Sequence, residues 1–463
     1  MLFNSHIFML LFLPLLLAGW YFLNWKKKFQ LAQGYLIGMS LWFYAYANLQ
    51  YLWLLLFSCL IGWLLSCLPE KIFSGKGKKE LTGVGCVFHL GLLGYFKYSN
   101  FFLENLNTVF HTDFPMLQIL LPVGISFYTF QQLAYLIDRC RGDAPRDSFF
   151  DYLTFMVYFP QLLQGPILLR SEFMGQLKEP ERRRFHAERF SEGIQFFVFG
   201  LAKKVLLADT LAKAVNYGYS NVSMLDSISA LLLAVGYLTE LYFDFSGYCD
   251  MAVGLGKMIG LEVAENFDAP FHSASVKEFW RRWHMTLGRF FTRYVYIPLG
   301  GNRRGKMRTL CNVMIVMLLS GLWHGAAWTF VLWGFLHGVG MIWDNLEHPH
   351  LPKKWMRQAA TFAYVCMTFV FFRAESIAQG VDVLKSIVSL KWNGFVFQMA
   401  SALDMTECYM ITKALSMKLP GLLSWFWLGV FVVLIAICFR VLSGEKVSGV
   451  VALKRQKGYG RLY

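Results

Sequence analysis

The amino-acid sequence predicts an all-α polytopic membrane protein, with about 11 to 13 transmembrane or re-entrant helices. Of its 463 residues, 56% are hydrophobic and only 16% are charged. A soluble globular domain carries about 25% charged residues, so this chain has too few to cover a surface that faces water. Apolar runs of about 20 residues, each long enough to cross the hydrocarbon core, recur along the whole chain.

The basic residues predict how the chain is oriented in the membrane. The net charge is +15, but it falls in short clusters between apolar runs, at residues 26–28, 71–79 and 139–146. The intervening loops, 48–50 and 98–117, contain no Lys or Arg. By the positive-inside bias, we expect a cytoplasmic (inner) membrane protein with its N-terminus outside. Its basic loops and basic C-terminal tail would then be cytoplasmic, and this scattered charge does not indicate a nucleic-acid partner.

Neither the first apolar run nor the cysteines indicates a secreted, disulfide-bonded protein. The run from Phe8 to Leu23 has no basic region before it and no small-residue cleavage site after it. We therefore expect a retained first helix rather than a signal peptide. The nine cysteines are scattered, mostly in apolar runs, and none forms a CxxC pair. Such cysteines are typical of small buried apolar residues.

The chain is predicted to form a single membrane domain over residues 1–463, without a linker or a strong internal repeat. Within it we distinguish peripheral N-terminal helices (1–115), a core (116–345) and C-terminal helices (346–463). The core is less regular, because polar residues lie close to its apolar runs and glycines interrupt them. In lipid, irregular backbone is tolerated only where protein covers it or where it lines an aqueous cavity. A tunnel or a site is therefore expected in the core.

A basic stretch in the core, residues 265–308, is predicted to lie at the inner membrane interface. Its apolar residues recur every three or four positions from Phe279 to Ile297, which predicts one amphipathic helix. Its arginines could anchor that helix or bind an anion. The loop that follows, residues 298–305, is rich in backbone amides and cations that could hold the phosphates of a coenzyme. Another charged stretch, from Arg170 to Arg189, is predicted to be a solvated helical loop.

Two histidines lie in an apolar segment, residues 318–345, where titratable groups are costly and a functional interpretation gains weight. His324 stands between Gly321 and Gly325, which allow close approach of backbone or ligand. Burial would keep this imidazole neutral, as a general base requires; the alternative is a core histidine bonded to a carbonyl. His337 would be about 20 Å away on a continuous helix. A shared metal site would need a break between them, so no metal is predicted.

The roles of two further sets of polar residues stay open. Asp244, Ser246 and Asp250 lie beside an apolar run. They could hold a broken helix by internal hydrogen bonds, or they could line a tunnel. Tyr128 and Gln131 in the SFYTFQQ segment raise the same two interpretations.

Long motifs in the chain resemble the membrane-bound O-acyltransferase superfamily, and within it the bacterial branch that contains alginate O-acetyltransferase. The similarity spans almost the whole sequence, and the motifs occur in the same order. They are LPVGISFYTFQQLAYLID (121–138), YFDFSGYCDMAVGLGKMIG (242–260), ENFDAPF (265–271), FWRRWHMTLGRFFTRYVYIPLGGNRRG (279–305), SGLWHGAAWTFVLWGFLHG (320–338) and FVFFRAES (369–376).

The resemblance implies a ring of helices around a central tunnel, with the acyl donor entering from the cytoplasm and the acceptor from the far side. His324 in the WHG motif would be catalytic, taking the proton of the acceptor hydroxyl, a role worth roughly 10²–10⁴-fold. His284 in RWHMT would be the second catalytic position, holding the thioester or stabilising the oxyanion. A covalent acyl-imidazole on His324 is the alternative, and His337 is assigned to structure. Contacts to coenzyme phosphates are expected from Arg282, Asn302, Arg303 and Arg304.

The resemblance also implies what is transferred. We expect an acyl group, namely acetyl, to pass from acetyl-CoA toward an extracytoplasmic polysaccharide, such as alginate, peptidoglycan or another cell-surface glycan. No permanently bound cofactor is expected, and a periplasmic or secreted SGNH-type acyltransferase would be the partner. The alternative within the enzyme class is D-alanyl transfer from a carrier protein toward teichoic acid. The alternative outside it is a lipid-linked sugar transporter or flippase, which the absence of a visible repeat in the sequence and the small number of intramembrane acids disfavour.

Overall fold

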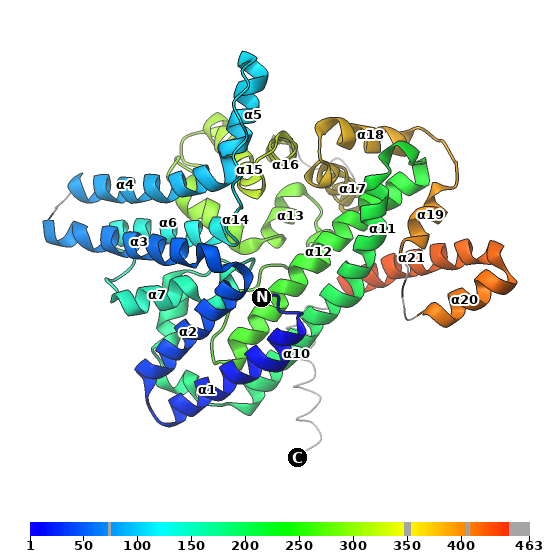
Figure 1. The fold of residues 1–463 in the computed structure, drawn as a ribbon. Helices are drawn as coiled ribbons and strands as arrows, with labels where there is room; N and C mark the ends of the chain where they lie inside the picture. Colours follow the sequence, from blue (N-terminus) through cyan, green and yellow to red (C-terminus); the bar gives the residue numbers. More distant parts are fainter. Residues whose placement is uncertain (73–75, 347–352, 404, 406–407, 444–463) are drawn as a thin grey trace. The chain divides into compact units, whose positions relative to one another are not determined.

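The computed structural model describes residues 1–72, 76–346, 353–403, 405 and 408–443 (Figure 1). All regular structure in these ranges is helical, without a β-strand, which confirms the predicted all-α class. The chain divides into two compact units. Unit 1 comprises Met1–Val198, Tyr248–Glu265 and Thr286–Pro298, and unit 2 comprises Phe199–Gly247, Asn266–Met285 and Leu299–Tyr463. The basic tail, 446–463, lies outside the described residues, and the single-domain assignment stays a prediction.

Unit 1 contains the N-terminal helices. Its α-helices are α1 (Leu13–Trp25), α2 (Phe29–Asn48), α3 (Leu52–Ile72), α4 (Lys76–Leu93), α5 (Ser99–Phe110), α6 (Ile125–Arg141), α7 (Phe149–Val157), α8 (Phe159–Leu162), α9 (Arg170–Leu177), most of α10 (Ala187–Ala202) and most of α14 (Met285–Phe291). Shorter 3-10 and π-helical turns join them at η1 (Phe8–Phe12), η2 (Leu49–Tyr51), η3 (Gly94–Tyr98), η4 (Pro180–Arg183) and η8 (Thr292–Tyr296).

Helix α6 forms much of the buried interior of unit 1. It packs on α3 and α4, and its Phe130 ring stacks on Phe290 with 4.1 Å between centroids. Tyr128 and Gln131 are both about 1% exposed. The Tyr128 hydroxyl and both polar atoms of the Gln131 amide have no hydrogen-bond partner. These polar atoms therefore make no hydrogen bond that would favour one of their two interpretations, holding a broken helix or lining a tunnel, over the other.

Unit 2 contains the C-terminal helices. Its α-helices are α11 (Asp209–Ser220), the first two thirds of α12 (Ser227–Met258), α13 (Val276–Arg282), α15 (Lys306–His324), α16 (Trp328–Leu346), α17 (Lys354–Arg373), α18 (Ile377–Val388), α19 (Phe395–Ser401), α20 (Tyr409–Lys418) and α21 (Pro420–Ser443). Its shorter turns are η5 (Lys203–Ala208), η6 (Val222–Met224) and η7 (Pro270–His272). The pairs α15–α16, α16–α17, α13–α16 and α19–α21 pack against each other.

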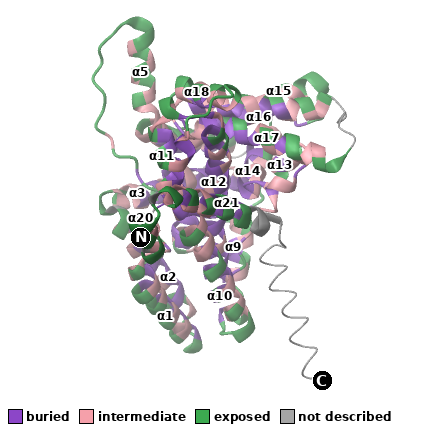
Figure 2. Cartoon of the chain, turned by 90° about the vertical axis from the view of Figure 1, so that its right-hand side faces the viewer, coloured by how far each residue is buried: buried purple, intermediate pink, exposed green. Residues whose placement is uncertain are grey.

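Among the residues that the structure describes, five helical segments are long and apolar enough to cross a membrane: Phe8–Trp25, Leu49–Cys67, Ser227–Met258, Lys306–His324 and Gly421–Cys438. The chain is thus a multi-pass membrane protein. Large apolar side chains remain exposed on these helices, including Leu10, Trp53 and Val433; Figure 2 shows the mixture of buried and exposed faces. The sequence predicted 11 to 13 segments because that number also included re-entrant segments. The five segments named above are only those long enough to span a membrane, so the larger number stays a prediction.

The structure excludes one interpretation of the polar residues near Asp244 and qualifies one local prediction. Helix α12 runs unbroken from Ser227 to Met258, so the polar residues on it do not hold a broken helix. Asp244 instead forms an ion pair with Lys204, while the Ser246 hydroxyl is buried without a partner. The stretch from Arg170 to Arg189 is only partly a solvated loop, because Arg183 is about 5% exposed. Its Nε donates to the Leu177 carbonyl.

Candidate active site

A helical hairpin in unit 2 places His324 at its turn. Helix α15 ends at His324, Gly325 follows in extended conformation, and α16 begins at Trp328. The two helices touch backbone to backbone: a Cβ added to Gly321 would lie 2.3 Å from the Phe330 carbonyl oxygen. One added to Gly334 would lie 2.4 Å from the Met317 carbonyl oxygen. The sequence thus fixes the His324 backbone through glycines that let the two helices meet.

Aromatic rings surround the His324 imidazole. The centroid distances are 4.8 Å to Trp323, 5.2 Å to Trp333 and 5.1 Å to Phe372. The imidazole of His284 lies 6.5 Å away, centroid to centroid. His324 itself is partly exposed. The structure therefore brings together the two histidines that the sequence assigned to catalysis, in mainly apolar surroundings.

His284 lies at a sharp break in the backbone. Helix α13 ends at Arg282, Trp283 is extended, and α14 begins at Met285. His284 has φ 46°, a left-handed conformation that costs a non-glycine residue roughly 1–2 kcal/mol. Such strain persists where surrounding structure imposes it, and it is concentrated at functional sites. The predicted continuous amphipathic helix over 279–297 was therefore wrong.

Backbone hydrogen bonds to the ENFDAPF segment hold this break in place. The Asp268 N–H donates to the Arg282 carbonyl at 2.9 Å, and the Met285 N–H donates to the Asn266 carbonyl at 2.9 Å. They bracket the two non-helical residues on either side. The apolar periodicity continues across the break, since Phe279, Trp283 and Leu287 are all buried. For that reason the apolar periodicity of the sequence could not reveal the helix break at His284.

The His284 imidazole is held by one hydrogen bond and has one free nitrogen. Its Nδ1 lies 3.1 Å from Asn266 Oδ1, while its Nε2 is buried without a partner. Because Oδ1 only accepts, this arrangement puts the proton on Nδ1 and a lone pair on Nε2. The ring packs edge-on against Phe245, 4.7 Å between centroids. Burial lowers the pKa of His284 to about 3, so the ring is neutral at physiological pH.

The low pKa of His284, which lies outside the five spanning segments, predicts a loss of stability in acid. The unfolded chain takes up a proton as the pH falls through about 6.5, whereas the folded chain does so only near 3. Between pH 7.5 and 5 this difference amounts to about 2 kcal/mol. We expect wild type to lose more thermal stability over this interval than His284→Asn, which cannot titrate. Unfolding temperatures in detergent measure the difference. The exposed His186→Asn variant should follow wild type; an equal loss in His284→Asn contradicts the assignment.

His337 has the bonding of a structural residue. Trp280 Nε1 donates to its Nδ1 at 3.3 Å, and its Nε2 lies 2.9 Å from the Thr368 hydroxyl. Both ring nitrogens are thus satisfied. The helix break needed for a shared metal site does exist, but the Trp333 ring packs against both imidazoles, 5.2 Å from His324 and 4.9 Å from His337. In the described ranges, no group of three His, Cys, Asp or Glu side chains is arranged to hold a metal ion.

The candidate phosphate-binding residues fall into two groups. Asn302, Arg303 and Arg304 are exposed on the turn 298–305. Arg282 is instead engaged: its Nη2 pairs with Glu278 at 2.8 Å, and its Nη1 donates to the Asp268 carbonyl at 3.3 Å. The turn is anchored by Asn312, which is buried on α15 and donates to the Gly301 carbonyl at 3.0 Å. Of the four candidates, Arg303 and Arg304 on the turn are therefore the cations exposed to an anion.

Sequence reasoning missed Asn266, Trp333 and Phe372, which surround the two histidines. Asn266 and Phe372 both lie in motifs that carried the family resemblance, ENFDAPF and FVFFRAES. No spacing rule connects such distant positions with His284 or His324. The resemblance of these short motifs was the one available signal.

Unit 2 thus places two histidines 6.5 Å apart among aromatic rings, an arrangement suited to acid–base chemistry on a hydroxyl or acyl group. The chain belongs to the membrane-bound O-acyltransferase family, because the sequence model of that family matches residues 142–379. This confirms the predicted family and makes the chain an O-acyltransferase, so the transporter interpretation is set aside.

Particular relatives are similar over most of the chain. The peptidoglycan O-acetyltransferase of Helicobacter pylori is 35% identical over 423 residues, covering 84% of this chain and 80% of the relative. The probable alginate O-acetylase AlgI of Azotobacter vinelandii is 39% identical over 389 residues, covering 81% and 76%. The teichoic acid D-alanyltransferase of Bacillus subtilis is 28% identical over 271 residues, covering 55% and 69%.

Proposed function

We propose that this O-acyltransferase moves an acetyl group from cytoplasmic acetyl-CoA across the membrane for O-acetylation of an extracytoplasmic polysaccharide. The proposal is supported by the relatives named as O-acetylating enzymes, which align over more than four fifths of the chain. The D-alanyltransferase aligns over 55% at lower identity. Acetyl transfer is therefore favoured over D-alanyl transfer.

The observation that carries the mechanism is the partly exposed His324 imidazole with His284 6.5 Å away. His324 accepts the proton of an acceptor hydroxyl while the hydroxyl oxygen attacks the thioester carbonyl carbon. The tetrahedral intermediate collapses with cleavage of the C–S bond, and His324 returns the proton to the leaving thiolate. The products are the O-acetyl ester and the free thiol, and His324 is regenerated neutral.

His284 takes a role in this scheme that follows from its hydrogen bonding. With its proton donated to Asn266, its Nε2 lone pair can accept a hydrogen bond from a substrate O–H or N–H. That atom suits substrate positioning better than donation to an oxyanion, which needs a hydrogen-bond donor. Of the two roles expected for His284, we therefore propose positioning.

Donor recognition is proposed for the turn 298–305, through Asn302, Arg303 and Arg304. Arg282 would instead stabilise α13 and the 266–268 segment through its pair with Glu278 and its bond to the Asp268 carbonyl, rather than bind phosphate directly. We also propose that the turn faces the cytoplasm, with the N-terminus outside, following the positive-inside bias. A periplasmic or secreted SGNH-type acyltransferase would then receive the acetyl group or act with this chain on the outer side.

Removing the turn cations is expected to weaken donor binding without slowing the chemical step. We expect Arg303→Ala/Arg304→Ala to raise KM for acetyl-CoA about tenfold, equivalent to about 1.4 kcal/mol, with kcat unchanged. Steady-state kinetics in proteoliposomes measure both constants. Arg184→Ala, at an exposed arginine of unit 1, is the matched control. A fall in kcat with KM unchanged would assign these arginines a different role.

The proposed function is tested in membranes given radiolabelled acetyl-CoA together with peptidoglycan or alginate fragments and a candidate partner. Label in the polysaccharide or in the partner, dependent on this chain, supports acetyl transfer. Transfer that occurs only from an alanylated carrier protein would overturn the proposal in favour of D-alanyl transfer.

A further inference from the structure

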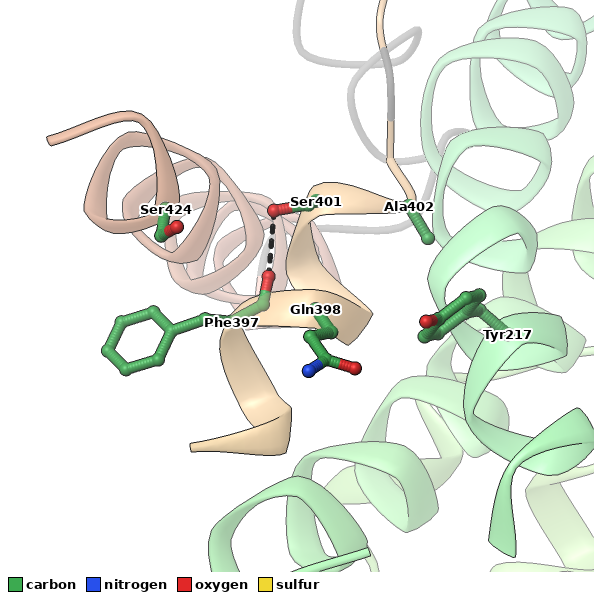
Figure 3. Close-up of a pocket in the computed structure, with 6 residues that line it drawn as sticks. All are labelled: Tyr217, Phe397, Gln398, Ser401, Ala402 and Ser424. Carbon is green, nitrogen blue, oxygen red and sulfur yellow. Dashed lines mark hydrogen bonds between the residues drawn. The ribbon is translucent and has the colours of Figure 1, made fainter. Parts of the chain in front are cut away.

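A second concave site lies in unit 2, among α11, α19 and α21. It has a volume of about 400 Å³ and is lined by Tyr217, Phe397, Gln398, Ser401, Ala402 and Ser424. Figure 3 shows these side chains, with the Phe397 ring and the Tyr217 ring on opposite sides of α19. The proposed reaction assigns none of these residues a role.

The lining combines aromatic faces with uncharged polar groups. The Phe397 ring is flanked by Trp425 at 4.7 Å and Trp392 at 6.1 Å, centroid to centroid. Tyr217 contributes a further ring, which stacks on Phe395. The side chain of Gln398 is exposed and offers both an amide donor and an amide acceptor. The Ser401 hydroxyl donates to the Phe397 carbonyl at 2.8 Å, which leaves its oxygen lone pairs available.

This chemistry matches a neutral sugar better than an anion. The electron-rich face of an aromatic ring attracts the C–H groups on the apolar face of a pyranose, while amide and hydroxyl groups pair with the sugar's polar substituents. None of the six lining residues is charged. Binding a carboxylate there would remove water from a charge without supplying a cation, which is costly. An amide-bearing neutral hexose would also match the donor and acceptor of Gln398.

The site is linked to His324 by a short series of contacts. Tyr217 follows Asn216, whose Oδ1 accepts a hydrogen bond from Arg373 Nη2 at 2.9 Å. Arg373 follows Phe372, whose ring packs on His324 at 5.1 Å. Helix α15 separates His324 from the basic turn by 19 residues, or about 28 Å. These contacts therefore join the concave site to the end of α15 that lies away from the proposed donor side.

We propose that the concave site binds a neutral, N-acetylated hexose unit of the glycan acceptor, at a distance from the reacting hydroxyl. This rests on the proposed function and narrows its acceptor from polysaccharides in general to those built of neutral amide-bearing sugars, rather than polyuronates. Binding remote parts of a substrate supplies energy that can be used to orient the reacting group. It also keeps a polymer in place between successive transfers.

The test is direct binding, measured without acetyl-CoA on the full chain in lipid nanodiscs. An N-acetylglucosamine tetramer and a mannuronate tetramer are titrated separately by calorimetry. We expect saturable binding of the neutral tetramer and at least tenfold weaker binding of the mannuronate tetramer. In Phe397→Ala and Gln398→Ala, the Kd for the neutral tetramer should rise at least tenfold.

Control variants and outcomes distinguish this proposal from a membrane-interface role of the aromatic rings and from a failure of the proposed function. Trp53→Ala and Gln30→Ala change an exposed aromatic and an exposed amide of unit 1 and should bind like wild type. Because Gln398 is exposed, its variant should fold even where Phe397→Ala does not. No saturable binding, equal binding of both tetramers, or unchanged Kd in Gln398→Ala overturns the proposal; the aromatic rings would then be a membrane-interface belt. Binding with no acetyl transfer would overturn the proposed function alone.

Discussion

Replacing His324 with alanine is expected to lower acyl transfer at least about 100-fold while the protein still folds. General base catalysis contributes roughly 10²–10⁴-fold; the rings of Trp323, Trp333 and Phe372 that pack on His324 carry no basic nitrogen, and the His284 imidazole lies 6.5 Å away. Because His324 is partly exposed at a helix end, its removal leaves the contacts between α15 and α16 at Gly321 in place. Transfer of radiolabelled acetyl groups, normalised to the amount of folded protein, measures the effect.

His186→Ala is the matched control for this variant. His186 is an exposed histidine of unit 1 whose Nε2 lies 3.1 Å from the Glu181 carbonyl, and its removal should leave activity unchanged. If His324→Ala keeps more than about a tenth of wild-type activity, the base has been wrongly assigned. Accumulation of acetylated wild-type enzyme on His324 would instead favour the covalent acyl-imidazole route.

Gly321→Ala is expected to destabilise the protein by about 1–3 kcal/mol, the usual range for overpacking, and to reduce activity at least tenfold. The new Cβ would lie 2.3 Å from the Phe330 carbonyl oxygen and 3.3 Å from the Gly334 Cα. Both are backbone atoms, which cannot rotate away as the end of a side chain can. The two helices must therefore separate, which displaces His324 one turn later. Unfolding temperature and activity in the same detergent measure the two effects.

Gly429→Ala supplies the control for that substitution. Gly429 is also helical, on α21, but a Cβ there would meet nothing within 4 Å. Since alanine is favoured over glycine in a helix by about 1 kcal/mol, this variant should be as stable as wild type or more so. A Gly321→Ala protein with wild-type stability would mean that α15 and α16 can separate without cost.

The sequence predicted the fold class and the two histidines that the structure brings together, for different reasons. The all-α class followed from composition and apolar length, which depend on the solvent and not on tertiary contacts. His324 was singled out by the cost of a titratable group in an apolar segment, and the family resemblance assigned it to catalysis. His284 followed from the family resemblance, because the pattern around it predicted one continuous helix. Whether either histidine is catalytic stays a prediction until the variants are measured.

What the sequence could not predict depends on contacts between distant residues. The break at His284 is fixed by hydrogen bonds from residues 266 and 268, and no glycine marks the left-handed position. Conversely, the glycines of α12 suggested a broken helix, yet they serve close packing. A Cβ on Gly247 would lie 2.7 Å from the Gly200 carbonyl oxygen, and one on Gly254 would lie 2.5 Å from that of Gly193. A glycine can mark a break or a close contact, and the local sequence does not distinguish them.

The left-handed backbone at His284 has a consequence for protein engineering. Glycine, and to a lesser degree asparagine, adopts φ 46° with less strain than histidine,. The gain is offset where the smaller side chain leaves the space against Phe245 unfilled,, so a selection for heat resistance alone favours such a replacement, which discards the imidazole, only where neighbouring side chains repack. Screens for stable forms of this enzyme should score acyl transfer alongside melting temperature. Otherwise the most stable variants recovered will include inactive ones.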